Sequence, residues 1–151
     1  MLNIAAYSGT LVCSKEGGMM QQTILIIDDD DMIRSLVQLY LEREGYRVIA
    51  AGNGPAGVDM YETENPDLVV LDIAMPEMSG FDVTTKIRAI EKRERRPHTP
   101  IIILTAYARS FFLSAGSAAG IDSYLTKPIA PEKLLEHIHQ FLGKPETSEE
   151  E

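Results

Sequence analysis

One short stretch constrains the fold of this chain more than any other. It is the run Thr23 to Ile27, which is followed directly by four aspartates, Asp28 to Asp31. The run is short, β-branched and continuous rather than alternating, which is typical of a strand buried on both faces. Such a strand brings the aspartates that follow it to one edge of a sheet. A hard divalent cation such as Mg²⁺ relieves the repulsion between carboxylates placed so close together. The alternative is a solvated turn whose acids cap the next helix.

Runs of the same kind recur and alternate with helical periodicity. Four further strands are predicted, at Tyr46 to Ala51, Asp67 to Asp72, Ile101 to Thr105 and Ser123 to Thr126. Helices are predicted from the aspartates to Gly45, where Ile33, Leu36, Val37, Tyr40 and Leu41 recur at helical steps, and over about 53–64, 80–90, 107–118 and 131–142. Strands this apolar, separated by helices, favour a parallel sheet covered on both faces. The expected fold class is α/β, a doubly wound parallel sheet of five strands.

In such folds the site lies at the carboxyl ends of the strands. The residues predicted there are three acids, a hydroxyl and an amine: Asp28, Asp29, Asp72, Thr105 and Lys127. Each has an ordinary explanation, since Asp72 and Thr105 fit turns and Lys127 fits a solvated surface. Those explanations together require the strand pattern to gather five such residues by accident, so we expect a functional site at this edge.

These residues suit phosphoryl transfer. Asp28, Asp29 and Asp72 form an acidic pocket for Mg²⁺, which takes one or two carboxylates and keeps several waters. A carboxylate can also be the nucleophile and form an aspartyl-phosphate. Lys127 would neutralise one phosphoryl oxygen and Thr105 would donate a hydrogen bond to another.

Four motifs occupy these strand ends: Ile26-Ile27-Asp28-Asp29, Leu71-Asp72-Ile73-Ala74-Met75-Pro76 with Gly80, Leu104-Thr105-Ala106, and Tyr124-Leu125-Thr126-Lys127-Pro128. With this combination the chain resembles a response-regulator receiver domain of two-component signalling, which is CheY-like. The resemblance covers about residues 22–142 and implies a flavodoxin-like fold, in agreement with the pattern of strands and helices.

The resemblance implies that Asp72 accepts a phosphoryl group from the phosphohistidine of a sensor histidine kinase or a histidine phosphotransfer protein. It implies that Mg²⁺ is bound directly by Asp29, Asp72 and the Ala74 carbonyl, while Asp28 acts through water. No enzyme activity is expected beyond self-phosphorylation and autodephosphorylation at Asp72.

The resemblance also implies a switch made of Thr105 and Tyr124. Phosphorylation would draw the Thr105 hydroxyl inward, and the Tyr124 ring would follow into the vacated space. The signal would then reach a downstream protein partner through residues 107–142. The function expected is that of a single-domain response regulator, with a receiver fragment of a hybrid kinase or a phosphorelay shuttle as the alternative.

Two segments depart from the usual receiver pattern. Residues 110–116 carry little charge, which indicates either a hydrophobic docking surface or deeper burial of an unusual helix. The basic segment Lys92 to Arg96 lengthens the exit from the third predicted helix, as in receivers attached to hybrid kinases. We expect this segment to be a solvated loop.

Two other classes fit less well. A haloacid-dehalogenase-like phosphatase also uses a strand-end Asp, a Thr or Ser, and a Lys. It requires Thr or Val two positions after its second Asp, where this chain has Met32 or Ile33, and a Gly-Asp-x-x-x-Asp stretch that does not follow Lys127. A docking domain that never takes phosphate is disfavoured by the intact acids with Thr105 and Lys127.

Composition limits location and partners. The net charge of −9 argues against nucleic acid as a direct partner. No apolar run approaches the ~20 residues of a membrane span, and residues 1–13 lack the basic start of a secretory signal. The single cysteine, Cys13, suits a reducing cytoplasm.

The ends of the chain differ in composition from its middle. Residues 1–21 are expected to be a leader outside the fold, disordered or from a non-native start, because Gly17-Gly18 breaks the chain before the first strand. The receiver domain is expected over 22–142. Residues 143–151 carry Pro145 and four glutamates, and they are predicted to be a disordered acidic tail.

Overall fold

The computed structural model describes residues 21–106 and 120–144. Within them, five parallel strands form one sheet in the order β2-β1-β3-β4-β5. The strands are β1 (Thr23–Ile27), β2 (Arg47–Ala51), β3 (Leu68–Asp72), β4 (Ile101–Thr105) and β5 (Ser123–Thr126). Strand order reverses between β1 and β3, which are neighbours in the sheet and paired from Ile24 with Leu68 to Ile27 with Leu71.

Side chains of the three central strands alternate between two hydrophobic cores. Ile24 and Ile26 of β1 belong to one core, whereas Leu25 and Ile27 belong to the other. All five side chains of β1, β3 and β4 are buried. The continuous apolar runs therefore reflect a sheet covered on both faces, as expected from the sequence.

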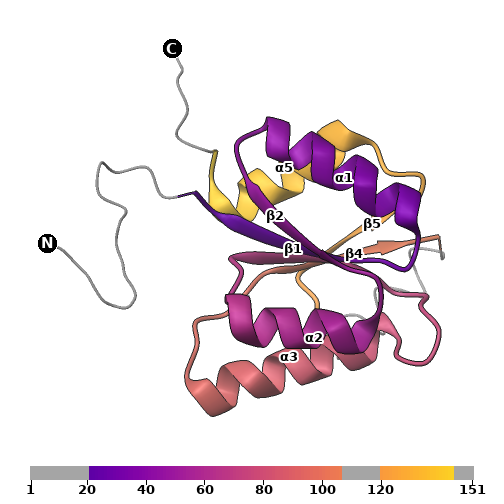
Figure 1. The fold of residues 1–151 in the computed structure, drawn as a ribbon. Helices are drawn as coiled ribbons and strands as arrows, with labels where there is room; N and C mark the ends of the chain where they lie inside the picture. Colours follow the sequence, from indigo (N-terminus) through magenta and orange to yellow (C-terminus); the bar gives the residue numbers. More distant parts are fainter. Residues whose placement is uncertain (1–20, 107–119, 145–151) are drawn as a thin grey trace, which may run out of the picture.

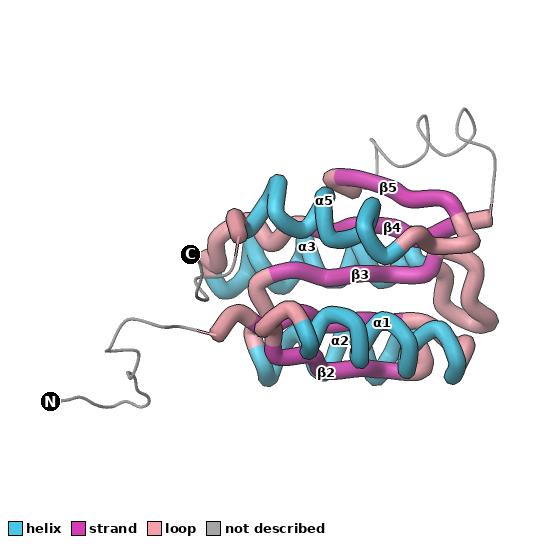
Figure 2. Tube along the Cα trace, turned by 90° about the horizontal axis from the view of Figure 1, so that it is seen from above, coloured by secondary structure: helices cyan, strands magenta, loops and turns pink. Residues whose placement is uncertain are grey.

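Helices cover the two faces in pairs (Figure 1). The described helices are α1 (Asp31–Arg43), α2 (Gly54–Glu64), α3 (Gly80–Glu94) and α5 (Pro131–Leu142). Viewed from above, α1 and α5 lie over the face that Ile24 and Ile26 enter, and α2 and α3 lie beneath the other face (Figure 2). Among the described residues, no helix is long and apolar enough to cross a membrane.

Local signals in the sequence set where these helices start. Asp30 caps α1 by accepting hydrogen bonds from the backbone of Met32 and Ile33. Ser79 and Asp82 form a reciprocal capping box at the start of α3. Both caps belong to loops that leave the carboxyl ends of β1 and β3, so they fix the approach of those helices to the candidate site.

The α/β fold with a doubly wound sheet of five parallel strands is confirmed, and the strand boundaries agree to within one residue. Asp67 lies just before β3, where its backbone N–H donates to the Thr23 carbonyl oxygen and its side chain accepts a 2.8 Å hydrogen bond from the backbone of Thr23. The helix predicted over 107–118, the apolar segment 110–116 and most of residues 1–21 and 143–151 lie outside the described residues.

The prediction of a solvated loop for Lys92 to Arg96 is wrong about the loop, because residues 92–94 are helical, whereas residues 92–95 are exposed as expected. Helix α3 extends into this segment, and Arg93 pairs with Glu62 of α2 across 2.6 Å. Arg96 donates to backbone carbonyl oxygens of α2 and lies 5.0 Å from the centre of the Tyr61 ring. The reason is that α2 and α3 lie side by side, so these cations have carboxylates, carbonyls and an aromatic face within reach.

Candidate functional site

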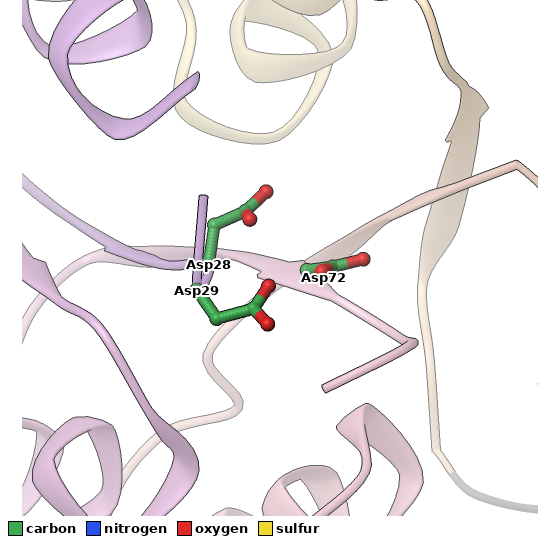
Figure 3. Close-up of side chains that lie close together, drawn as sticks. All are labelled: Asp28, Asp29 and Asp72. Carbon is green, nitrogen blue, oxygen red and sulfur yellow. The ribbon is translucent and has the colours of Figure 1, made fainter. Parts of the chain in front are cut away.

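Three carboxylates meet where β1 and β3 end. Asp28 and Asp29 follow β1, and Asp72 is the last residue of β3 (Figure 3). One oxygen of each lies within 4.8 Å of the others. The sequence predicted this cluster, and the pairing of β1 with β3 explains it, because adjacent parallel strands end at the same edge.

Asp28 is the most buried of the three acids, with no exposed surface. Its Oδ1 accepts a 2.9 Å hydrogen bond from the Asp30 backbone, whereas its Oδ2 is buried without a hydrogen-bond donor among the described residues. A buried carboxylate oxygen without a donor is costly unless a cation balances it. Asp29, by contrast, is exposed at the mouth of the cluster.

Asp72 is also buried, and its Oδ1 accepts a long 3.3 Å hydrogen bond from the backbone of Ala74. Burial first, and then the charge of Asp28, raise the pKa of Asp72 above its ordinary value even though Lys127 opposes them. The ionised form of Asp72 is therefore held at some cost to the fold. Such a cost at a strand end is typical of a functional position.

Lys127 supplies a cation to this cluster. Its Nζ lies 3.2 Å from Asp28 Oδ2 and 3.4 Å from Asp72 Oδ1. The contact with Asp28 Oδ2 is an ion pair but does not have the geometry of a hydrogen bond. Burial lowers the pKa of Lys127, but the two carboxylates outweigh burial and the pKa is raised, so the amine stays protonated at neutral pH. One ammonium cannot neutralise three carboxylates.

Thr105 ends β4 and is buried, and its carbonyl oxygen accepts a 2.7 Å hydrogen bond from the backbone of Lys127. Tyr124 lies further back on β5, opposite Ile103, and packs partly buried against the core on the α2 and α3 face. Thr105 is two positions after Ile103 on β4, so the two side chains share a face of the sheet. Tyr124 pairs with Ile103 and therefore lies on that same face. The structure thus places Thr105 at the edge and Tyr124 behind it.

The donor set suits Mg²⁺. Carboxylate oxygens within a few ångströms of one another are ligands for a hard cation, and the single ammonium of Lys127, shared between Asp28 and Asp72, leaves much of their negative charge unbalanced. Asp29 and Asp72 could bind the ion directly. The Ala74 carbonyl, predicted as a further ligand, belongs to the loop that leaves β3 beside them.

Two further residues, Arg34 and Gly80, help to shape the site, although the sequence analysis assigned no role to either of them. Arg34 donates a 2.7 Å hydrogen bond to the Asp28 carbonyl and pairs with Asp31, which fixes the loop between β1 and α1. Gly80 lies against the end of β3, where a Cβ would come within 2.8 Å of the Asp72 carbonyl oxygen. Arg34 follows the aspartates at helical spacing, the one signal that could have identified it.

Comparison with known proteins adds an independent line of evidence. A family model described as response regulator receiver domain matches residues 24–139. The alkaline phosphatase synthesis transcriptional regulatory protein PhoP of Bacillus subtilis is 36% identical over 116 residues, which are 77% of this chain and 46% of PhoP. The chain therefore spans about half the length of this relative.

Solved structures agree with the computed fold. Chemotaxis protein CheY4 of Vibrio cholerae superposes with a TM-score of 0.74 at 29% identity, covering 81% of this chain and 99% of CheY4. The receiver domain of the sensor histidine kinase PA1611 of Pseudomonas aeruginosa has a TM-score of 0.72 at 30% identity, covering 83% of this chain and all of that domain. The PA1611 structure has a magnesium ion coordinated in its active-site cleft.

Proposed function

Because the chain belongs to the response regulator receiver domain family, we propose that Asp72 is the residue that accepts a phosphoryl group and that this transfer requires Mg²⁺. The observation that carries the proposal is the position of Asp72, buried at the end of β3 with Asp28, Asp29 and Lys127 gathered around it. Receiver domains act as signalling modules rather than conventional enzymes.

Among the three acids, we assign the role of nucleophile to Asp72, which ends β3 beside Lys127. Its carboxylate oxygen would bond to phosphorus as the bond from phosphorus to the donor nitrogen breaks, and the departing imidazole nitrogen, which keeps the electrons of that bond, would take up a proton from solvent. Asp28 is fully buried and tied to the Asp30 backbone, which leaves it less free to react. Asp29 and Asp72 would hold the ion, whose charge offsets that of the carboxylates and of the phosphoryl oxygens.

Lys127 and Thr105 would bind the transferred group. The ammonium of Lys127 already contacts Asp72 Oδ1, so an oxygen of a phosphoryl group on Asp72 would fall within its reach. Thr105 stands at the end of the neighbouring strand β4, since Asp72 pairs with Leu104. A hydroxyl at that place can donate to a second phosphoryl oxygen.

The donor we propose is the phosphohistidine of a sensor histidine kinase or of a histidine phosphotransfer protein, and the output is a change in the binding of a downstream protein through residues 107–142. The shared face of Thr105 and Tyr124 supports a two-state element between site and surface. The proposal holds equally for a stand-alone regulator and for a receiver joined to a kinase such as PA1611, because both need the same acceptor.

A phosphorylation assay tests the acceptor. The protein is incubated with a small phosphodonor and Mg²⁺, and the labelled peptide is mapped. Label is expected on Asp72 alone, lost in Asp72→Asn and in excess chelator, and retained in Asp59→Asn, an exposed aspartate of α2. Label that survives in Asp72→Asn would refute the assignment, and undiminished labelling in chelator would refute the need for Mg²⁺.

A second assay tests the switch. Tyr124→Ala should leave phosphorylation largely intact while partner binding no longer responds to it. Amide exchange with and without a phosphoryl mimic reports the surface that changes. Protection that shifts only around Asp72, and nowhere in residues 107–142, would show that this output surface is wrong.

A further inference from the structure

Arg34 binds the segment of four aspartates that follows β1 at three of its four residues. The guanidinium donates a 2.7 Å hydrogen bond to the Asp28 carbonyl oxygen and pairs with the Asp31 carboxylate. The backbone N–H of Arg34 donates to the Asp30 carbonyl oxygen across 3.0 Å. Arg34 is therefore bonded to every member of the segment except Asp29.

The four carboxylates divide between holding the loop and facing the site. Asp28 accepts a hydrogen bond from the Asp30 backbone, and Asp30 in turn caps α1. Asp31 pairs with Arg34. Among the described residues, the Asp29 carboxylate has neither a hydrogen bond nor an ion pair, and it lies in the cluster of three carboxylates (Figure 3). The place of this carboxylate is thus set by the backbone that carries it.

The bond from Arg34 fixes the peptide group that joins Asp28 to Asp29. A peptide group is planar, so holding its oxygen also sets the direction in which the chain continues to Asp29. We propose that Arg34 is a positioning residue for Mg²⁺. Its guanidinium bridges Asp28 and Asp31 and so holds the backbone of Asp29 where the Asp29 carboxylate reaches the ion. The inference rests on the proposed function, because it takes Asp29 as a ligand of Mg²⁺.

Gly52, the residue after β2, leaves room for this guanidinium. A Cβ placed on Gly52 would have three Arg34 atoms as its nearest neighbours, the first of them Nη1 at 3.2 Å. The φ of Gly52 is not positive, so the backbone there accepts an alanine. The added methyl group would instead displace the guanidinium by a few tenths of an ångström. Gly52 is therefore a place from which Arg34 can be moved without changing any charge.

The charge of Arg34 and its geometry have opposite effects on metal binding. A cation beside the carboxylates repels Mg²⁺, so loss of Arg34 would tighten binding if charge were its main contribution. Loss of the bridge would loosen the loop that carries Asp29 and weaken binding. Residues that orient metal ligands typically change metal affinity by about 10- to 100-fold when they are replaced. The sign of the change therefore separates the two contributions.

Binding of Mn²⁺ to the unphosphorylated protein, with Mg²⁺ as competitor, measures the site through the paramagnetic resonance signal of free Mn²⁺. Both ions prefer carboxylate oxygens. Arg34→Gln is expected to weaken binding about tenfold. Arg34→Lys keeps the charge but lacks the planar fork that reaches two acceptors, so it should not restore affinity. Arg43→Gln is the matched control, because it removes the same charge from the exposed far end of α1 and should bind like the wild type.

Unchanged or tighter binding in Arg34→Gln overturns the proposal, and so does full affinity in Arg34→Lys. Urea unfolding checks that the variants fold, which is expected because Arg34 is 23% exposed. A wild type that binds neither ion would refute the proposed need for Mg²⁺ and this inference with it. A wild type that binds equally with its Arg34→Gln variant refutes the inference alone.

Gly52→Ala tests the same link at constant charge. It should weaken binding about twofold in the wild type and have no further effect in Arg34→Gln, because the two positions act through one contact. Equal weakening in both backgrounds would show that Gly52 acts without Arg34, and would overturn the proposal.

Discussion

The two ends of the sheet use the same kinds of residues to opposite effect. At the carboxyl ends of β1 and β3, three acids share one amine, and a buried oxygen of Asp28 has no hydrogen-bond donor among the described residues. At the amino end of β4, the buried carboxylate of Glu91 accepts hydrogen bonds from Arg88, the Thr99 backbone and Tyr61.

The amino-end network is closed around Arg88. Its guanidinium also donates to the carbonyl oxygens of Thr99 and Gly120 and to the carboxylate of Asp122. Asp122 in turn accepts from the backbone of Ile101 at the start of β4. One guanidinium faces two carboxylates there, but each carboxylate also accepts hydrogen bonds from further donors, so this end stabilises the fold. At the carboxyl end one ammonium faces three carboxylates with fewer donors, which leaves the excess negative charge that a site for a cation requires.

The largest effect expected from this difference follows removal of the central cation. Arg88→Met should leave Glu91 and Asp122 without their common partner and lower the free energy of unfolding by about 3 kcal/mol. Urea unfolding measures the change. Arg93→Met is the matched control, because Arg93 is 58% exposed and its loss should cost less than about 1 kcal/mol. Equal losses in the two variants would show that the Arg88 network is no more than a surface pair.

A smaller loss is expected from Glu91→Gln, which keeps shape and removes charge. The amide cannot accept all the bonds that the carboxylate accepts from Arg88, Thr99 and Tyr61, so unfolding should become easier by about 1.5 kcal/mol. Thermal and urea unfolding give the value. An unchanged or raised stability would mean that Glu91 is tolerated by this network rather than required by it.

The two ends also differ in how well the sequence predicts them. Asp28, Asp72, Thr105 and Lys127 each end or follow a short apolar strand, and the parallel topology alone brings such positions together. The interpretation of these residues needed no side-chain geometry. Their roles as acceptor, ligand and switch are a different matter, since they rest on the resemblance and stay predictions.

The network around Arg88 at the amino end of β4 is harder to predict from the sequence. Arg88 and Glu91 stand three residues apart on α3, a spacing that is common on solvated helix faces. Asp122 is far away along the chain and meets them only after β5 has paired with β4. Leu36 recurs at helical steps together with Val37 and Leu41, yet it is 60% exposed whereas those two residues are buried. Periodicity predicts that a segment is helical more reliably than it predicts which residues at the margin of the apolar face are buried.

Adding Mg²⁺ should sharpen the contrast between the ends. Binding to the folded state alone stabilises it by about 1.4 kcal/mol when the free ion is tenfold above its dissociation constant. Unfolding of the wild type with and without Mg²⁺ measures this gain, which should be much reduced in Asp29→Ala and retained in Arg93→Met. A full gain in Asp29→Ala would place the ion elsewhere than among the three carboxylates.

The smallest expected effect is the one that ionised Asp72 has on the stability of the metal-free protein. Burial and the charge of Asp28 raise the pKa of Asp72, so its ionised form is less favourable in the folded chain than in the unfolded one. A folded-state pKa above the unfolded value means that the folded state binds the proton more tightly. The resulting penalty is therefore present at neutral pH and disappears as pH falls through the raised pKa towards the ordinary one.

Asp72→Asn should accordingly raise the stability of the metal-free protein at pH 7 by about 1 kcal/mol, or about 2–4 °C in Tm, the opposite sign to Glu91→Gln. The advantage over the wild type should shrink as pH is lowered, and chelator must be present so that bound Mg²⁺ does not stabilise the wild type. Asp59→Asn, on the exposed side of α2, should show neither the gain nor its loss at low pH. A destabilised Asp72→Asn would mean that the contact with Lys127 outweighs burial and Asp28, and that both ends of the sheet are built for stability.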